Sequence, residues 1–396
     1  MRQALFISVS ILGIAVAILF LKRIRPADLQ TSDFINFYAA GSIVRRGDSA
    51  TLYTRETQNA AFHSLLGYAT TQYFLHPPFE AAGFALFSYL PIQNAFIVWT
   101  LINVALLGIL PAVLKPAVPL ISSAPYFGIL GLAFLPVLIA LSLGQDSVLL
   151  LFIYGSCYAL LVRRRDAAAG AVLALAAIKF QYLVVFLPLI LAWRKFRFLA
   201  GFLAGSLGLA CVSAITVGMK GLLTYFTFLR SFEVHSGYGS LNPTLMVNWR
   251  GFLAGTGLTA HLAAYTLFGS FALLALGFAC TRVQAEHATN LVFAICLTIS
   301  LTASPYTHFP DASLLLLSIL IVLDHVHGTQ HAYFAKLAQS CCALLFLWPW
   351  LLLALGGHYW WNSRIYLVFP VLLLFLLAIV AVLHHENRTF GQIAAA

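Results

Sequence analysis

Long apolar runs alternate with short polar segments along most of the chain. Their lengths approach the ~20 residues that an α-helix needs to cross the hydrocarbon core of a membrane. Two further runs, Phe79–Leu90 and Ala167–Trp193, are short or interrupted, and the second carries Lys179 near its middle. This second run is interpreted either as a hairpin of short helices or as one bent helix. The clear runs are Ala4–Leu21, Ala95–Leu114, Tyr126–Leu143, Val148–Val162, Phe198–Val217, Leu262–Cys280, Leu291–Ala303, Ala312–Leu323, Ala343–Leu355 and Ile365–Leu383.

The pattern predicts an all-α polytopic membrane protein with about 11–13 transmembrane helices. Helices satisfy every backbone hydrogen bond within lipid, so we expect one integral membrane domain over residues 1–396. Two long segments, at about 22–78 and 219–251, interrupt the pattern. Loops longer than about 15 residues usually carry function. Both are rich in aromatic residues, so we expect them at the membrane interface, with the first one partly helical.

Composition supports the membrane class. The chain has 396 residues, of which 61% are hydrophobic and 9% charged, whereas a soluble domain carries about 25% charged residues. The net charge of +10 is expected to hold the topology and to face anionic lipid. No nucleic-acid-binding motif accompanies it, so nucleic acid is not expected as a partner. The six cysteines lie in apolar runs without metal-ligand spacing, and no metal or cofactor is predicted.

Charge clusters give part of the orientation. The basic groups at Arg163–Asp166 and Arg194–Arg197 are predicted to be cytoplasmic by the positive-inside rule. An even number of crossings must then separate them. The cluster Lys22–Arg25 would pull the first long loop toward the same side, so charge alone leaves the face of that loop open.

The first long loop contains the acid that we consider the strongest candidate. The stretch "TSDFINFYAAG" predicts the start of an amphipathic helix with Thr31 or Ser32 as N-cap. One interpretation is that Asp33 only favours the helix dipole, a contribution of about 0.3–1 kcal/mol. The other is a functional carboxylate, which at a helix N-terminus would have a low pKa and stay ionised at neutral pH.

Isolated polar residues in apolar surroundings are the other candidates. Lys179 has no charged neighbour in sequence. Since a lysine at membrane depth costs about 2.5–3.5 kcal/mol, it usually faces a cavity or a partner. The alternative is a hairpin tip from which the amine reaches the interface. His76 in "FLHPPF" is either a ligand contact or a structural histidine, and Gln145 precedes a helix start at which Asp146 would be the N-cap.

Two later motifs complete the set. "LNPTLMVNWRG" groups Asn242, Asn248 and Arg250, which suit hydroxyl groups and a phosphate. They could equally anchor the chain at the interface. "SPYTHFPDASLLL" contains His308 and Asp311, which Pro310 keeps off a shared helical face, so a zinc site is not expected there.

The order of these motifs resembles glycosyltransferase family 87, whose members have the type-C fold and use polyprenyl-phosphate sugars. The family includes bacterial mannosyltransferases. The resemblance runs from Asp33 to about Leu315 through "DFINFYAAGSIVRRGDSATLY", "HPPFEAAGFALF", "GQDSVLLL", "NPTLMVNWRG" and "SPYTHFPDASLLL". Two departures concern the subfamily: "GQDS" has an acid where a more neutral residue is expected, and "SPYTHFPD" lacks a tryptophan that some members carry.

The resemblance implies an inverting transfer of a sugar, with mannose as one possibility, from a polyprenyl-phosphate donor to a lipid or glycan acceptor. It also implies that this transfer takes place at the extracytoplasmic face, where the two long loops at about 22–78 and 219–251 would lie. Asp33 corresponds to the general base, which takes the proton of the acceptor hydroxyl. Other polar residues are expected to bind the substrates. The expected location is the inner (plasma) membrane, with membrane lipids as further partners. A multi-span transporter or flippase is the alternative. The candidate substrate-binding residues are His76, Gln145, Lys179, Asn242, Asn248, Arg250, His308 and Asp311.

Overall fold

The computed structural model describes residues 29, 32–67, 73–123, 131–234, 242–282, 289–327, 332–356 and 364–395. Within these ranges the regular structure is helical, and one isolated antiparallel bridge joins Met246 to His308. The α-helices are α3 (Phe34–Arg45), α4 (Arg55–Leu66), α5 (Pro78–Ala85), α6 (Ile92–Leu114), α7 (Leu120–Ser123), α9 (Leu135–Leu143), α10 (Ser147–Val162), α11 (Asp166–Ala174), α12 (Phe180–Ala192), α13 (Phe196–Val234), α14 (Trp249–Gly255), α15 (Leu262–Thr281), α16 (Thr289–Ala303), α17 (Leu315–His327), α18 (Ala332–Gly356) and α20 (Val368–Ala395). Short 3₁₀-helices are η1 (Ser49–Thr51), η2 (Phe87–Tyr89), η3 (Leu175–Lys179), η5 (Pro243–Leu245), η7 (Phe309–Leu314) and η9 (Ile365–Leu367).

Among the described residues, 7 helical segments are long and apolar enough to cross a membrane. The apolar helices Ser147–Val162 and Thr289–Ala303 are shorter. This confirms the predicted all-α polytopic class. The expected first crossing, Ala4–Leu21, lies outside the described residues. The long segments are Ile92–Leu114, Asp166–Ala192, Phe196–Ser231, Leu262–Thr281, Phe309–His327, Tyr333–Leu355 and Ile365–Arg388.

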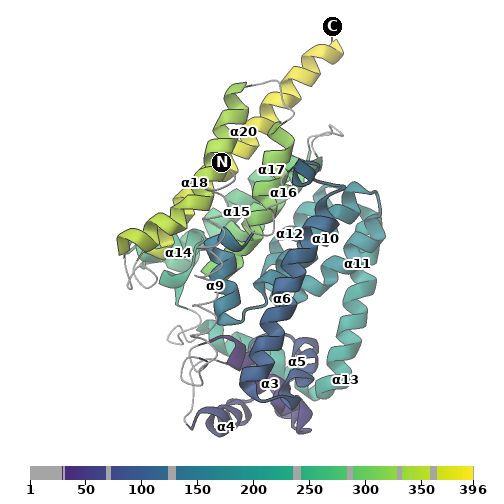
Figure 1. The fold of residues 1–396 in the computed structure, drawn as a ribbon, viewed down its shortest axis with the longest axis vertical. Coiled ribbons are helices and arrows are strands. Elements are labelled where there is room, and N and C mark those ends of the chain that lie inside the picture. The colour runs from purple at the N-terminus through teal and green to yellow at the C-terminus, as the bar shows by residue number, and fades with distance from the viewer. Residues whose placement is uncertain are drawn as a thin grey trace.

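The first long loop folds into a helical cap at one end of the molecule. Figure 1 shows α3, α4 and α5 together there, while α20 reaches the opposite end. The cap has its own buried aromatic cluster, in which Phe37 stacks on Phe84 and Tyr53 contacts Tyr225 of α13. The helix α3 starts one or two residues later than predicted, because Asp33 itself occupies the N-cap position and its side chain makes no capping hydrogen bond.

The second long loop is shorter than predicted. Residues 219–234, expected as loop, continue the rod of α13 beyond a break at Gly218, where φ is 71° and ψ is 171°. Tyr225 and Phe228 from this extension join the aromatic cluster of the cap. The apolar face they present to the cap is what keeps this stretch helical. The described remainder of the loop, residues 242–251, holds η5 and the start of α14.

The interrupted run Ala167–Trp193 is a re-entrant hairpin. The helical segment α11–η3–α12 is long enough to cross a membrane. Its two ends nevertheless lie together, because the Lys195 Nζ atom is 4.0 Å from Asp166 Oδ2. The helix α11 packs along α13, whereas α12 packs on α15 and α16. The chain therefore enters from one face, turns at η3 and returns, so that the first of the two predicted alternatives is correct.

Glycines hold the entry of this hairpin against α13. A Cβ at Gly170 would lie 1.9 Å from the carbonyl oxygen of Phe198, and one at Gly201 would lie 1.9 Å from that of Ala167. Such backbone approach is how helices associate tightly in lipid, where apolar side chains gain little from leaving the solvent. The position of the hairpin, and of the tip that it carries, depends on these contacts.

We expect Gly170→Ala to destabilise the protein by at least the ~1–3 kcal/mol of an overpacked core, because the methyl group meets backbone that cannot rotate away. Gly208→Ala, in the same pair of helices, is the control, since a Cβ there has nothing within 4 Å. It should be neutral or slightly stabilising. Melting temperatures of the purified proteins in detergent test this. Equal melting temperatures for the two variants would contradict the close packing.

Candidate active site

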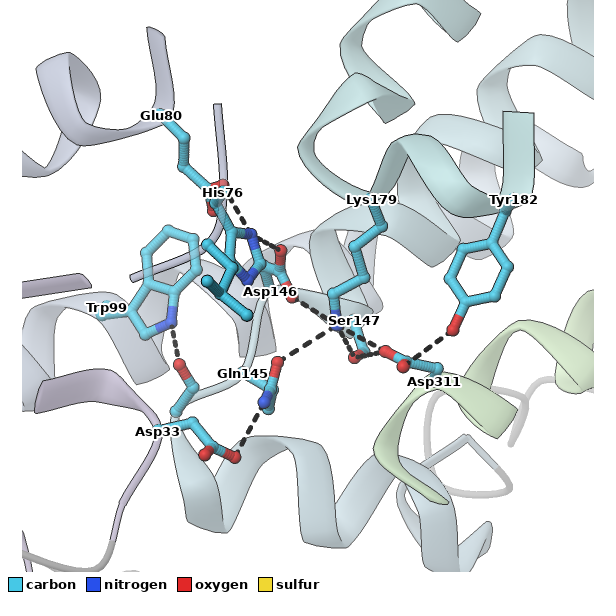
Figure 2. A network of polar contacts seen from close by, with 12 residues as sticks. Asp33, His76, Glu80, Trp99, Gln145, Asp146, Ser147, Lys179, Tyr182 and Asp311 are labelled. Atoms are coloured by element: carbon cyan, nitrogen blue, oxygen red, sulfur yellow. Dashed lines mark hydrogen bonds and ion pairs between the residues drawn. The ribbon is translucent and has the colours of Figure 1, made fainter. Parts of the chain in front are cut away.

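A line of polar contacts links three segments that are far apart in sequence. Gln145, between α9 and α10, donates a hydrogen bond from Nε2 to Asp33 Oδ2 at 2.7 Å. Lys179, at the end of η3, donates from Nζ to Gln145 Oε1 at 3.1 Å. Figure 2 shows this line, which runs from Asp33 through Gln145 to Lys179. The cap, the α9–α10 turn and the hairpin tip thus meet at one place.

The turn that carries Gln145 depends on Gly144. This glycine ends α9 with φ at 66°, a left-handed conformation that other residues adopt at a cost. Its carbonyl accepts a hydrogen bond of 2.9 Å from the indole of Trp99 on α6. A Cβ here would lie 2.7 Å from Phe34 Cβ and 2.9 Å from the ring of Phe96. The first residue of α3 therefore packs directly against the turn, which brings Asp33 beside Gln145.

Lys179 lies between two buried carboxylates. Its Nζ atom is 2.7 Å from Asp146 Oδ1 and forms a second ion pair with Asp311 Oδ1. It also donates to Ser147 Oγ at 3.0 Å. Asp311 accepts further hydrogen bonds from Ser147 at 2.8 Å and from the Tyr182 hydroxyl at 2.7 Å. Because Lys179, Asp146 and Asp311 are at most 5% exposed, each charge depends on the others for compensation.

Next to these residues, His76 lies between two carboxylates. Its Nδ1 atom is 2.8 Å from Glu80 Oε2 and 3.5 Å from Asp146 Oδ2. The ring packs edge-on against Phe37, and its backbone carbonyl accepts a hydrogen bond of 2.6 Å from Tyr53. Burial lowers the pKa of His76, but the two carboxylates outweigh it and raise that pKa. Burial raises the pKa of Glu80 to about 7, against the opposing effect of His76.

These three side chains are also the candidate metal ligands of the site. The ligand atoms of His76, Glu80 and Asp146 lie within 4.8 Å of one another, and one imidazole with two carboxylates is a common ligand set for a divalent transition metal. The Lys179 ammonium 2.7 Å from Asp146 opposes a second cation at that carboxylate. An imidazolium at His76, whose pKa is raised, already offsets the charge of the two acids.

Asp33 differs from the buried acids. It is only partly buried, and no described residue donates a hydrogen bond to its Oδ1 atom. Burial raises the pKa of Asp33, and the Gln145 hydrogen bond together with the charges of His308 and Lys179 only partly offsets this. The expected low pKa is therefore wrong. Desolvation outweighs the Gln145 hydrogen bond and the nearby positive charges, which leaves Asp33 a stronger base than an ordinary aspartate.

The structure brings together part of the predicted set. Asp33, Gln145, Lys179 and Asp311 form one network, and His76 joins it through Asp146. The amide nitrogen of His308 donates to Asp311 Oδ2 at 3.3 Å. The isolated bridge to Met246 holds the backbone of His308 in place.

The other three predicted residues make different contacts. Asn242 accepts hydrogen bonds from the backbone and hydroxyl of Thr244, at 3.1 and 2.9 Å. Asn248 is fully buried, donates to the carbonyl of Ser304 at 2.6 Å and caps α14. Arg250 lies over the ring of Tyr306, with its guanidinium carbon 5.0 Å from the centroid. The two asparagines fix loop backbone, and the described contacts of Arg250 lie outside the Asp33 network.

The sequence prediction left out four network residues. Asp146 was interpreted as an N-cap, which is its position at the start of α10, although its side chain makes no capping hydrogen bond. Glu80, Ser147 and Tyr182 were not singled out. Charge balance was the available signal: a lysine in an apolar run needs carboxylates, and Asp146 and Asp311 stand in similarly apolar surroundings.

Fold and site define a multi-pass α-helical membrane protein with a buried acid–lysine network beneath a helical cap. Comparison with protein families shows the family to which the chain belongs. Residues 74–305, more than half of the chain, match the model of glycosyltransferase family 87. The chain therefore belongs to this family of membrane glycosyltransferases, which favours a transferase over the transporter alternative. No curated protein and no solved structure matches it.

The matched range covers only part of the network. It includes His76, Gln145 and Lys179, whereas Asp33, His308 and Asp311 lie outside it. The hydrogen bonds and ion pairs of Gln145 and Lys179 connect the two groups. The network therefore joins residues inside the matched range to residues outside it.

We expect Lys179→Met to destabilise the protein by about 3–5 kcal/mol, because it leaves two buried carboxylates without their cation. Lys195→Met is the matched control from the other end of the hairpin. Its partner Asp166 is 4.0 Å away, and the two side chains are 30% and 21% exposed, so the loss should stay under ~1 kcal/mol. Unfolding in detergent measures both. Equal losses would show that the Lys179 ion pairs stabilise no more than a surface pair.

Proposed function

We propose that this protein transfers a sugar from a polyprenyl-phosphate donor to a hydroxyl group of a lipid or glycan acceptor, with inversion at the anomeric carbon and Asp33 as general base. The observation that carries the proposal is the contrast among the four network acids. Asp146 and Asp311 are both paired with Lys179, and Glu80 is paired with His76. Asp33 alone among them is partly exposed, with one carboxylate oxygen that accepts no hydrogen bond from the described residues.

The chemistry needs one base. The acceptor oxygen attacks the anomeric carbon as the bond from that carbon to the phosphate oxygen breaks, and the electron pair leaves with the phosphate. The hydroxyl proton goes to Asp33 Oδ1, so that a single displacement inverts the configuration. The raised pKa of Asp33 favours this transfer. The departing phosphate requires donors, and His308 is a candidate because it lies close enough to Asp33 to lower the pKa of that carboxyl.

The donor supplies its own leaving group, so neither a nucleotide nor a cofactor is part of this proposal. The polyprenyl chain would lie in the membrane, and the helical cap would contact the phosphate and the sugar. Arg45, the last residue of α3, and the following Arg46 are exposed on this cap. Arg45 lies over the ring of Tyr89, and Arg46 bonds to Ser42. They offer positive charge near an anionic substrate.

The charges at the two ends of α10 support an extracytoplasmic site. The exposed Arg163–Arg165 cluster follows α10 at the end where the hairpin also begins and ends. Ser147, at the other end of this 16-residue helix, belongs to the network, about 24 Å away at 1.5 Å per residue. If the arginines are cytoplasmic, as the positive-inside rule predicts, then Asp33 lies toward the opposite face of the plasma membrane.

Asp33→Asn tests the catalytic assignment. The amide keeps the size of the side chain but cannot accept the proton, so transfer from a labelled polyprenyl-phosphate sugar should fall about 10²–10⁴-fold. Binding of the anionic donor should change little. Asp48→Asn, an exposed acid after the same helix, should transfer at the wild-type rate. A well-folded Asp33→Asn variant with wild-type transfer would show that Asp33 is not the base.

The face of the site can be measured separately. In a background with the native cysteines replaced by alanine, we expect Asp48→Cys to react with a membrane-impermeant maleimide in intact cells. Arg165→Cys should react only after permeabilisation. Asp48 lies on the cap, whereas Arg165 follows the end of α10 that is far from the cap. The reverse labelling pattern would place the cap in the cytoplasm and would exclude transfer at the extracytoplasmic face.

A further inference from the structure

The lysine at the hairpin tip has more acceptors than protons to donate. An ammonium group has three N–H bonds, and Lys179 Nζ faces Asp146, Asp311, Ser147 and Gln145. Two of these acceptors are carboxylates, so the positive charge is already compensated and one negative charge remains. A further anion at this lysine would add to that excess. The geometry therefore does not favour a direct contact of Lys179 with an anionic substrate, the role that its place among the candidate substrate-binding residues would imply.

The contact with Gln145 has a different consequence. The amide has one accepting end and one donating end. Its oxygen faces the ammonium at 3.1 Å, and its nitrogen faces the Asp33 carboxylate at 2.7 Å. If the amide were rotated by 180°, its oxygen would face a carboxylate and its NH₂ group would face an ammonium, and both contacts would be repulsive. The charge of Lys179 thus selects the orientation in which Gln145 donates to Asp33.

This orientation determines how the two oxygens of Asp33 differ. Oδ2 accepts the amide hydrogen bond, while Oδ1 receives none from the described residues. A carboxylate held by one oxygen cannot rotate freely, so its second oxygen keeps a fixed direction toward the acceptor. In the contact between Lys179 and Gln145, the lysine is the residue held in place. Lys179 is 5% exposed, and the start of its hairpin packs tightly against α13 through glycines.

We propose that Lys179 is a positioning residue, which orients the Gln145 amide so that it holds one oxygen of Asp33 and leaves the other to accept the proton of the acceptor hydroxyl. The inference rests on the proposed function, since it assigns Asp33 the role of base. The addition to the proposed function is the role of Lys179, which acts through Gln145 and does not touch the substrate.

The pH dependence of transfer gives a direct test in Gln145 variants, which leave the lysine and its two carboxylates in place. The charged groups that act on Asp33 are His308, Lys179 and Asp311, and none of them is changed. In Gln145→Leu the donor is lost, so the pKa of Asp33 should rise and the acid limb of the kcat/KM profile should move to higher pH. In Gln145→Glu a second carboxylate faces Asp33, and the shift should be larger, at least about one pH unit.

Gln93→Glu, at the start of α6, adds the same charge outside the network and is the matched control. Its profile should coincide with that of the wild type. A graded shift, from wild type to Gln145→Leu to Gln145→Glu, supports the inference. Profiles that all superimpose would overturn it, because Gln145 would then not influence the base.

A double-mutant cycle separates positioning from phosphate binding. Gln145→Leu should lower kcat about 10- to 100-fold, the loss of one hydrogen bond to a charged group. If Lys179 acts through this amide, adding Lys179→Met to Gln145→Leu should lower kcat by less than about 3-fold, while the KM for the donor stays constant. A full additional loss with a raised donor KM would assign Lys179 to the phosphate and overturn the inference.

Two further outcomes are decisive. If Lys179→Met does not fold, the Gln145 series decides alone, since its pH shift does not depend on that variant. If Asp33→Asn transfers sugar at the wild-type rate, the proposed function fails and this inference fails with it. An inactive Asp33→Asn together with unshifted Gln145 profiles would leave the base assignment intact and reject only the positioning role.

Discussion

The arrangement of this protein depends on one buried cation. Lys179 needs Asp146 and Asp311, because an unpaired charge at this depth would cost several kcal/mol. The three residues come from the hairpin tip, the α9–α10 turn and η7. Satisfying a single ammonium therefore fixes the relative positions of three segments. Gln145 extends the same constraint to the helical cap, so that Asp33 is located by a charge that lies in another segment.

The apolar runs determine how much of the fold can be predicted from the sequence. They gave the membrane class and most helix positions, because lipid requires apolar side chains over the crossing length. They could not separate a crossing helix from the re-entrant hairpin, since both need a run of about that length. The distinguishing contacts, Lys195 with Asp166 and Gly170 with Phe198, join residues about 30 positions apart. The hydrophobicity pattern along the chain does not predict which residues form such pairs.

The site shows the same division. Isolation in an apolar run identified Lys179, because an intramembrane charge needs a partner whatever the fold. Grouping by sequence predicted Asn242 and Asn248. The side chain of Asn242 binds the backbone of its own loop, and that of Asn248 binds the carbonyl of Ser304. Asp33 was found through the family motif, but its pKa was misjudged. The helix N-terminus is visible in sequence, whereas the burial that outweighs it comes from the cap folding over the turn.

In the proposed reaction, a carboxylate base would have to act beside an anionic donor. The base must carry a negative charge, and a cation bound directly to Asp33 would hold that charge but lower its basicity. A neutral amide between lysine and aspartate avoids this: Gln145 transmits the orientation imposed by Lys179, and the full ion pairs are confined to Asp146 and Asp311. Asp33 thus keeps the raised pKa that burial gives it. Under the proposed positioning role, the buried lysine would act on the base through the orientation of the amide.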